Sequence, residues 1–164
     1  MKRKNTAALY LTRGAVIAAM YVALTYLSSL VGLSSGVIQF RVSEALCILP
    51  VFFPEAILGL TIGCLVSNLI TGAVIWDVIF GSLATFIGAA CARLMRGLPK
   101  KLIFLATLPT VIANAVIVPF VLIYAYGVEG AYFLFLLSVA IGEIVCATVG
   151  GTLLYYSLNK LRIK

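Results

Sequence analysis

Residues 102–126 read LIFLATLPTVIANAVIVPFVLIYAY, a run without a charged side chain that follows directly after Lys100 and Lys101. A helix that crosses the hydrocarbon core of a bilayer needs about 20 predominantly apolar residues, and this run supplies them. A water-soluble domain of this size could not bury such a run together with the others in the chain. The sequence therefore predicts a membrane-spanning helix here.

The rest of the chain has the same character, because 63% of the 164 residues are hydrophobic and 10% are charged. A soluble domain has roughly 25% charged residues. Five further apolar runs are present, at 7–33, 43–53, 55–71, 76–95 and 131–158. The run 43–53 is about half a span long and ends before Pro54, so it predicts a short, tilted or partly inserted helix. We expect one domain over 1–164, an all-α integral membrane protein with six transmembrane helices in a compact bundle.

The distribution of basic residues predicts the topology of this bundle. Most of them fall into three clusters: Lys2, Arg3, Lys4 and Arg13; Arg93, Arg96, Lys100 and Lys101; Lys160, Arg162 and Lys164. Clusters of this kind at the ends of apolar runs mark the cytoplasmic side of a membrane. Six crossings with the N-terminus inside place all three clusters, and both termini, in the cytoplasm. The turn at Pro54 and Glu55 should lie on the same side, although it carries no basic residue.

Several classes of function are disfavoured by what the sequence lacks. The net charge of +7 is explained by topology rather than by nucleic-acid binding, because the basic residues flank apolar runs. Four cysteines lie singly in apolar runs, which favours packing roles over disulfides or a metal site; they are Cys47, Cys64, Cys91 and Cys146. There is no histidine and no phosphate-binding GxxxxGK[ST] motif. We therefore expect no enzyme, no metal and no cofactor.

Polar and ionisable residues inside a bilayer are costly and indicate functional positions. In the predicted topology nearly all of them project into the outer half of the bundle and would converge on one outward-facing pocket; they are Arg41, Glu44, Asn68, Asp77, Asn114 and Glu143. Glu143 is the strongest candidate, because it lies about 13 residues, or roughly 20 Å, into the last run. At that depth its carboxyl group needs a proton, a hydrogen bond, Arg41 or a ligand cation.

Each of the other polar residues also has a structural interpretation. Arg41 and Glu44 are three residues apart and could form an ion pair that anchors a loop. Asp77 could serve as a negative charge at a helix N-terminus. Asn68 and Asn114 could form hydrogen bonds between helices.

Small residues form two patterns. Ala15, Ala19 and Ala23 make a stripe along one face of the first predicted helix, and Gly59 and Gly63 form a GxxxG motif in the third. Small residues at a spacing of four allow helices to approach closely. For the glycines we expect packing inside the bundle, and for the alanines we consider docking against another membrane protein.

Three short segments resemble a known family. They are Ile38-Gln39-Phe40-Arg41-Val42-Ser43-Glu44-Ala45-Leu46, Pro54-Glu55-Ala56 and Ser67-Asn68. Together with the alanine stripe and the predicted topology, they resemble the QueT family, the substrate-binding S components of energy-coupling factor (ECF) transporters that are annotated for queuosine precursors. The likeness runs from about Arg13 to Leu158.

The resemblance implies a mechanism and partners. An S component in a prokaryotic cell membrane binds a vitamin-like solute from outside, with its first loop as a lid. It then docks on a transmembrane T component through the AxxxA face, and two cytoplasmic ATPases power a toppling motion that delivers the solute inside. For this family the substrate would be a 7-deazaguanine, which can carry a protonated aminomethyl arm.

The resemblance also implies roles for individual residues. Glu143 and Glu44 would be carboxylate ligands, and Asn68 and Asn114 would read ring nitrogen and carbonyl groups of the substrate. Further expected substrate-binding residues are Gln39 and Arg41 as lid or gate groups, Trp76 or Phe40 stacked on the ring, and Asp77. Ala15, Ala19 and Ala23 would form the docking face for the T component.

Other classes of function stay open at this point. A small secondary transporter, proton-coupled through Glu143, would be expected to show an internal repeat, which the chain lacks. A lipid-directed membrane enzyme would have to rely on carboxylates such as Glu44, Asp77 and Glu143. A scaffold subunit would use its polar residues only to hold helices together.

Overall fold

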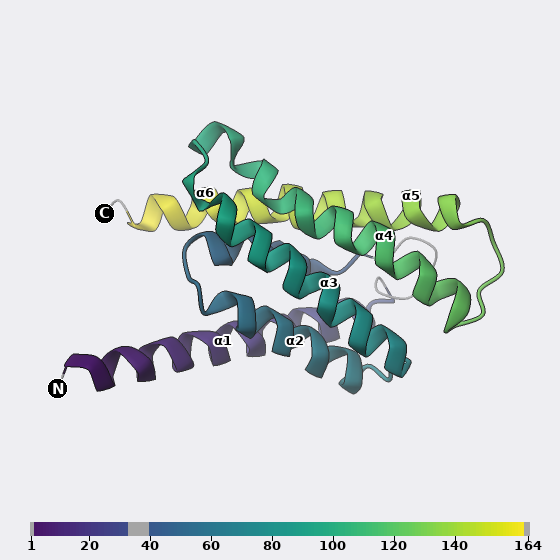
Figure 1. The fold of residues 1–164 in the computed structure, drawn as a ribbon, viewed down its shortest axis with the longest axis horizontal. Coiled ribbons are helices and arrows are strands. Elements are labelled where there is room, and N and C mark those ends of the chain that lie inside the picture. Colours follow the sequence, from purple (N-terminus) through teal and green to yellow (C-terminus); the bar gives the residue numbers. More distant parts are fainter. Residues whose placement is uncertain (1, 33–39, 163–164) are drawn as a thin grey trace.

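The computed structural model describes residues 2–32 and 40–162, with side chains for 7–32 and 40–161. Every regular element in these residues is helical (Figure 1). In chain order they are α1 (Lys2–Leu30), the 3₁₀-helix η1 (Val42–Val51), α2 (Ala56–Ile70), α3 (Ile75–Leu94), the 3₁₀ segments η2 (Met95–Gly97) and η3 (Lys100–Thr107), α4 (Leu108–Tyr124), α5 (Tyr132–Glu143), the π-helix η4 (Ile144–Gly150) and α6 (Gly151–Arg162).

These elements form the six helical runs that the sequence predicts. The segment η3 continues into α4, with Pro109 in the first turn of α4, and α5, η4 and α6 follow one another without a break. Four runs in the described residues are long and apolar enough to cross a membrane: Ala7–Leu30, Ile75–Gly97, Lys100–Tyr124 and Tyr132–Leu161. All-helical architecture is therefore confirmed.

The remaining two runs, η1 and α2, are shorter. A 3₁₀-helix rises about 2.0 Å per residue, so the 10 residues of η1 cover roughly 20 Å. The 15 residues of α2 cover roughly 22 Å at 1.5 Å per residue. Both are shorter than the roughly 30 Å of a hydrocarbon core. Full crossing by these two runs stays a prediction, and the expectation of a short second helix agrees with η1.

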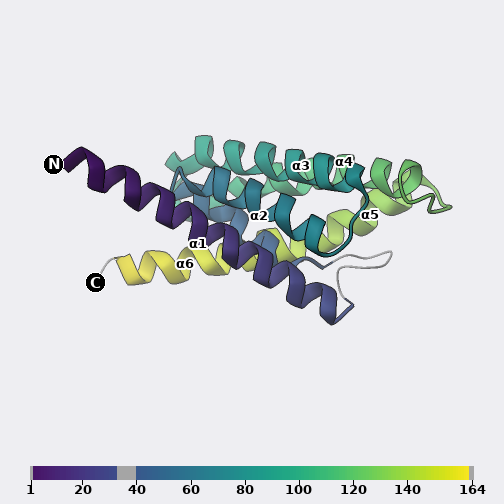
Figure 2. The same cartoon turned by 90° about the horizontal axis from the view of Figure 1, so that it is seen from below.

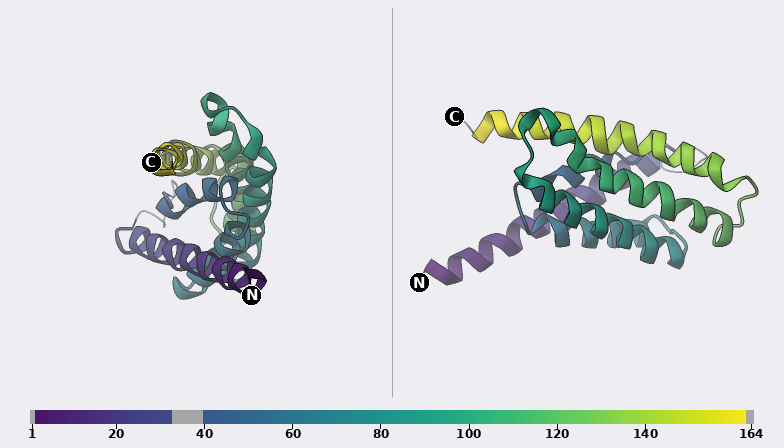
Figure 3. Two further views of the ribbon diagram at one scale, coloured as in Figure 1. Left: turned by 90° about the vertical axis from the view of Figure 1, so that its left-hand side faces the viewer. Right: turned by 45° about the horizontal axis from the view of Figure 1, so that its top comes forward.

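The runs alternate in direction, so that their connections gather at two ends. The start of α1, the end of α6, the η1–α2 turn and the α3–η3 connection lie at one end, on the left of Figure 1. The α2–α3 and α4–α5 connections lie at the other end, and the turned views in Figures 2 and 3 agree. Because Arg93, Arg96, Lys100 and Lys101 lie at the α3–η3 connection, we call the first end the basic end.

Two arginines from neighbouring helices contact the η1–α2 turn, which has no basic residue of its own. Arg13 of α1 lies with its Nη1 atom 3.5 Å from Glu55 Oε1, and its guanidinium carbon is 5.4 Å from the centre of the Phe53 ring. Arg93 of α3 donates two hydrogen bonds of 3.1 Å to the carbonyl oxygens of Pro50 and Val51. These carbonyls belong to the last turn of η1, where a helix leaves acceptors unpaired. The turn therefore shares the positive charge of the basic end.

The helices α1 and α2 cross closely at the glycines of α2. A Cβ atom placed on Gly59 would lie 2.6 Å from the carbonyl oxygen of Gly14, and one on Gly63 would lie 2.8 Å from Tyr21 Cβ. Neither distance leaves room for a larger residue without movement. The expectation that the GxxxG motif packs inside the bundle is confirmed.

Candidate functional site

The polar residues that the sequence singles out are buried, although the surrounding helices are apolar. Glu44 is 2% exposed, Asp77 6%, Asn114 5% and Glu143 7%, and the Arg41 side chain is 16% exposed. Arg41 directly precedes η1, Glu44 lies in η1, and the other three residues come from α3, α4 and α5. Groups of this kind are stable inside a bilayer only when they are paired, hydrogen-bonded or bound to a ligand. The partners of each group therefore indicate its role.

Glu44 has both carboxyl oxygens occupied. The Tyr21 hydroxyl of α1 donates a hydrogen bond to Glu44 Oε1, and the Cys47 thiol donates one of 3.0 Å to Glu44 Oε2. Next to this group the Thr25 hydroxyl lies 2.8 Å from the Ser43 hydroxyl. These contacts fix η1 against α1. Glu44 is thus held by the protein itself, on the side of the cluster that α1 covers.

Arg41 pairs with Asp77, which lies in another helix, and not with its neighbour Glu44. Arg41 Nη2 is 3.6 Å from Asp77 Oδ2, and the Tyr126 hydroxyl donates a hydrogen bond of 3.2 Å to the same oxygen. The backbone N–H of Val74 donates to the Tyr126 hydroxyl at 3.2 Å. These contacts join the start of η1, the start of α3 and the α4–α5 connection. Asp77 is thus more than a charge at a helix N-terminus.

Asn68 ties α2 to α3. Its Nδ2 atom donates a hydrogen bond of 3.3 Å to the carbonyl oxygen of Asp77 and a longer contact of 3.7 Å to Cys64 Sγ. Because Asn68 is 1% exposed, this donor is used inside the bundle. The geometry agrees with the structural interpretation of Asn68 as a hydrogen-bonding link between helices.

Glu143 and Asn114 each keep a buried polar atom without a hydrogen bond among the described residues, as Asp77 does at its Oδ1 atom. Glu143 is the last residue of α5 and directly precedes the π-helix η4, a helix type that is rare and frequent at functional sites. Its carboxyl group lies beside the Asn114 amide and within electrostatic range of Glu44 and Arg41. Yet Glu143 Oε2 and Asn114 Nδ2 make no hydrogen bond among the described residues. The two side chains are therefore close enough to interact with each other, while Glu143 Oε2 and Asn114 Nδ2 make no hydrogen bond of normal geometry in the described part of the chain.

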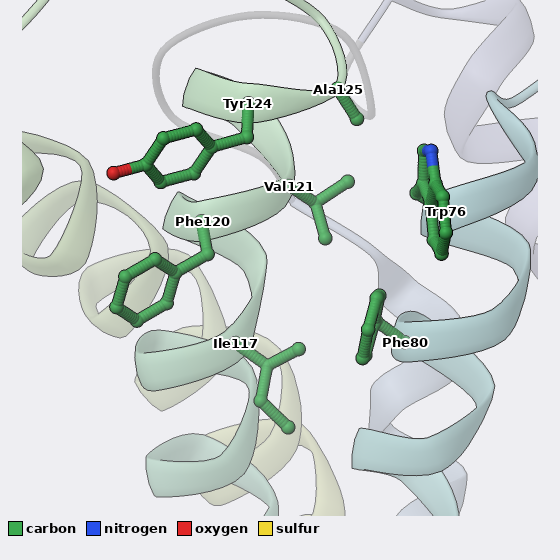
Figure 4. Close-up of a pocket in the computed structure, with 7 residues that line it drawn as sticks. All are labelled: Trp76, Phe80, Ile117, Phe120, Val121, Tyr124 and Ala125. Atoms are coloured by element: carbon green, nitrogen blue, oxygen red, sulfur yellow. The ribbon is translucent and has the colours of Figure 1, made fainter.

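Of the two predicted aromatic residues, Trp76 points away from the polar cluster. Trp76 is 53% exposed and lines an apolar groove of about 420 Å³ between α3 and α4, where it and Phe80 face Val121 and Ile117 (Figure 4). One residue step turns a helix by about 100°, so Trp76 and the inward-facing Asp77 cannot point in the same direction. Phe40 is partly buried. Gln39 lies outside the described residues.

The predicted docking residues Ala15, Ala19 and Ala23 are exposed on α1. Ala19 and Ala23 border an open apolar groove of about 590 Å³ that α1 forms with Ile62, Val66 and Ile70 of α2. The stripe therefore lies on the surface of the chain, whereas the glycines of α2 are covered by α1.

Sequence reasoning missed three parts of this site: Tyr21, Tyr126 and the π-helix. Tyr21 shares the buried face of α1 with Ile17 and Thr25 at a spacing of four residues, a signal that marks the covered face of a helix. Tyr126 follows α4 and contacts Asp77 across 49 residues of sequence, which no local pattern indicates. The π-helix has no composition signal in the sequence.

Comparison with known proteins gives two matches. The profile of a family described as QueT transporter matches residues 11–160. A protein of Lactococcus lactis subsp. cremoris (strain MG1363), named Queuosine precursor transporter QueT, is 44% identical over 73 residues. That alignment covers 44% of this chain and 43% of the relative, so the chain spans less than half of the relative's length in the match. No solved structure matches the chain.

Proposed function

This chain belongs to the QueT transporter family, and from that premise we propose that it is the substrate-binding S component of an ATP-driven ECF importer. In this proposal the chain lies in a prokaryotic cell membrane with its basic end and both termini in the cytoplasm. It captures a queuosine precursor from outside and delivers it inward by toppling against a T component.

The observation that carries the proposal is the pair formed by Glu143 and Asn114. Buried polar groups in proteins are usually paired, because an unpaired one costs about 1–3 kcal/mol. Glu44 and Asn68 follow this rule, whereas Glu143 Oε2 and Asn114 Nδ2 have no hydrogen-bond partner among residues 2–32 and 40–162. An open acceptor beside an open donor is the arrangement expected for a site that binds a polar solute.

The substrate class comes from the family and from the printed name of the relative. Queuosine precursors are 7-deazaguanines, which present N–H donors and a carbonyl acceptor on one edge of the ring. Carboxylate and amide groups are complementary to such an edge. In this proposal Glu143 and Asn114 contact the ring, and Glu44 and Arg41 surround the site. Gln39 and Arg41 act as gate groups, and Phe40 supplies stacking; Trp76 points into the outer groove between α3 and α4 and is not assigned to the site.

The partners follow from the same family. We propose that the T component docks on the face made by Ala15, Ala19 and Ala23, which is exposed and bordered by an apolar groove. Small residues allow a second helix to approach closely in a membrane. The sequence contains no phosphate-binding GxxxxGK[ST] motif, so ATP hydrolysis is assigned to two partner subunits.

The proposed function is tested by thermal unfolding of the purified chain with a panel of solutes. The panel contains 7-deazaguanine, its 7-aminomethyl derivative, queuine, guanine, riboflavin, thiamine and biotin. A ligand that binds only the folded state stabilises it by about 2.7 kcal/mol at a hundredfold excess over Kd. We expect stabilisation by the deazaguanines and none by the vitamins.

Other results would change the proposal in different ways. Stabilisation by a vitamin alone would keep the receptor role and remove the deazaguanine substrate. No stabilisation by any solute would contradict the receptor role and favour a secondary transporter or a scaffold subunit.

A further inference from the structure

The two deep carboxyl groups of the polar cluster differ in what they can still bind. Glu44 accepts hydrogen bonds on both oxygens, from Tyr21 and Cys47. Glu143 keeps Oε2 free of hydrogen bonds among the described residues. A solute that entered the cluster would have to displace Tyr21 or Cys47 to reach Glu44, whereas the Oε2 atom of Glu143 has no hydrogen-bond partner to displace among the described residues.

The neighbouring amide has a defined polarity. Asn114 Nδ2 is the atom without a hydrogen-bond partner in the described part of the chain, so the group that Asn114 still offers is a donor. It stands beside a carboxyl group that accepts. The two side chains come from different helices, α4 and α5, and both are more than nine-tenths buried.

We propose that Glu143 and Asn114 together read the lactam edge of a 2-amino-4-oxo-pyrimidine ring, the six-membered ring of a guanine or deazaguanine. The Glu143 carboxylate accepts from the ring N1–H and the 2-amino group, and Asn114 Nδ2 donates to the 6-oxo group. In this arrangement Glu44 is a positioning residue that shapes the cluster and does not touch the ligand. This inference rests on the proposed function. It names the edge of the substrate ring that the site recognises and the two side chains that recognise it.

Charge and geometry agree with this assignment. An N–H–N–H pair matches the two oxygens of one carboxylate, as a guanidinium group does. The positive charge of Arg41 lies within electrostatic range of Glu143 and is already paired with Asp77 at 3.6 Å. Arg41 therefore does not occupy the Oε2 atom of Glu143. A ring with the opposite pattern, such as adenine, would place its 6-amino donor against the Asn114 donor.

The experiment combines ligand analogues with protein variants, so that each ligand group is matched to one side chain. Affinities are measured by isothermal titration of the purified chain with three compounds. They are 7-deazaguanine, 7-deazahypoxanthine, which lacks the 2-amino group, and 6-thio-7-deazaguanine, which keeps N1–H but has a weaker acceptor in place of the 6-oxo group. The proteins are the wild type, Glu143→Gln, Asn114→Leu and, as matched control, Glu44→Gln.

For the wild type, we expect loss of the 2-amino group to weaken binding about tenfold or more, because it leaves a buried acceptor unpaired. In Glu143→Gln this penalty should fall to within about threefold, while the penalty for the 6-thio analogue persists. In Asn114→Leu the penalty for the 6-thio analogue should fall to within about threefold, while the penalty for loss of the 2-amino group persists. Glu44→Gln should weaken all three compounds by a similar factor, because its effect is on the shape of the cluster.

The outcomes separate this inference from the proposed function. If the wild type binds 7-deazaguanine and 7-deazahypoxanthine equally well, the edge assignment is wrong and the receptor role survives. The same conclusion follows if the relative affinities of the three compounds in each variant equal those in the wild type. If the wild type binds none of the compounds, the deazaguanine substrate and the edge assignment both fail. The wild-type comparison needs no variant, so a variant that does not fold leaves the test intact.

Discussion

The helix α1 has two sides that both involve small residues, and the structure uses them in opposite ways. On one side Gly59 and Gly63 of α2 pack against α1 so closely that a Cβ atom on Gly63 would lie 2.8 Å from Tyr21 Cβ. Ala15, Ala19 and Ala23 lie outside this contact and are exposed, and Ala19 and Ala23 border the groove between α1 and α2. Ala19 and Tyr21 are two residues apart and so about 200° apart around the helix. The covered side is part of the fold, and the uncovered side is available to a partner.

The difference shows that a small-residue pattern alone does not identify an interface. Both patterns have the spacing of four that permits close helix contacts in membranes. What separates them is whether another element of the same chain already covers them. The same distinction holds for the carboxyl groups, because both oxygens of Glu44 accept hydrogen bonds, whereas Glu143 Oε2 accepts none from the described residues.

The largest effect is expected on the exposed side of α1, and it should concern assembly. Ala19→Leu adds a bulky side chain where we propose that the T component makes close contact. We expect co-purification with the T component and substrate uptake to be abolished, while thermal stability and substrate affinity of the isolated chain stay at the wild-type value. Leu83→Phe is a matched control, because it adds bulk at an exposed position of α3, where Leu83 is 44% exposed. Intact assembly of Ala19→Leu would remove the docking role of the stripe.

A smaller effect is expected on the covered side, and it should concern the fold. Gly63→Ala places a methyl group against Tyr21 and Ala18, and such overpacking costs about 1–3 kcal/mol. We expect a lower thermal unfolding temperature in detergent. Gly97→Ala is the control, because no atom lies within 4 Å of its added Cβ. Equal stability of the two variants would contradict the close α1–α2 crossing.

The smallest effect is expected at the polar contact of the covered side. Tyr21→Phe removes the hydroxyl that donates to Glu44, and loss of one hydrogen bond costs about 1 kcal/mol. Tyr26→Phe is the control on the same helix, because Tyr26 is 46% exposed and exposed substitutions change stability by about 0.5 kcal/mol or less. If thermal unfolding of both variants matches the wild type, the Tyr21–Glu44 contact does not hold η1 against α1.

The sequence predicts the helical runs well, because the thickness of a bilayer fixes the length of an apolar helix. The local form of these runs is set by packing instead. A Cβ atom on Gly150 in the π-helix η4 would lie 3.1 Å from Ala45 Cβ of η1. The two residues are about 100 positions apart in the sequence, so the spacing of hydrophobic residues within one helix does not reveal this contact.

The polar residues themselves could also be identified from the sequence, because they interrupt apolar runs. Their partners could not. Arg41 has Glu44 three residues away, yet it pairs with Asp77 at the start of α3. Glu55 lacks a basic neighbour in its own turn and obtains Arg13 from α1. Such pairings depend on which helices cross, and no local sequence pattern shows which helices do.

The most direct test of the proposed S-component role is uptake of radiolabelled 7-deazaguanine into proteoliposomes, measured for this chain alone and with its T component and ATPases. If the chain is an S component, the chain alone binds the label and accumulates none inside. Accumulation should require all partner subunits and ATP. Accumulation by the chain alone would contradict the account and identify the protein as a self-sufficient transporter.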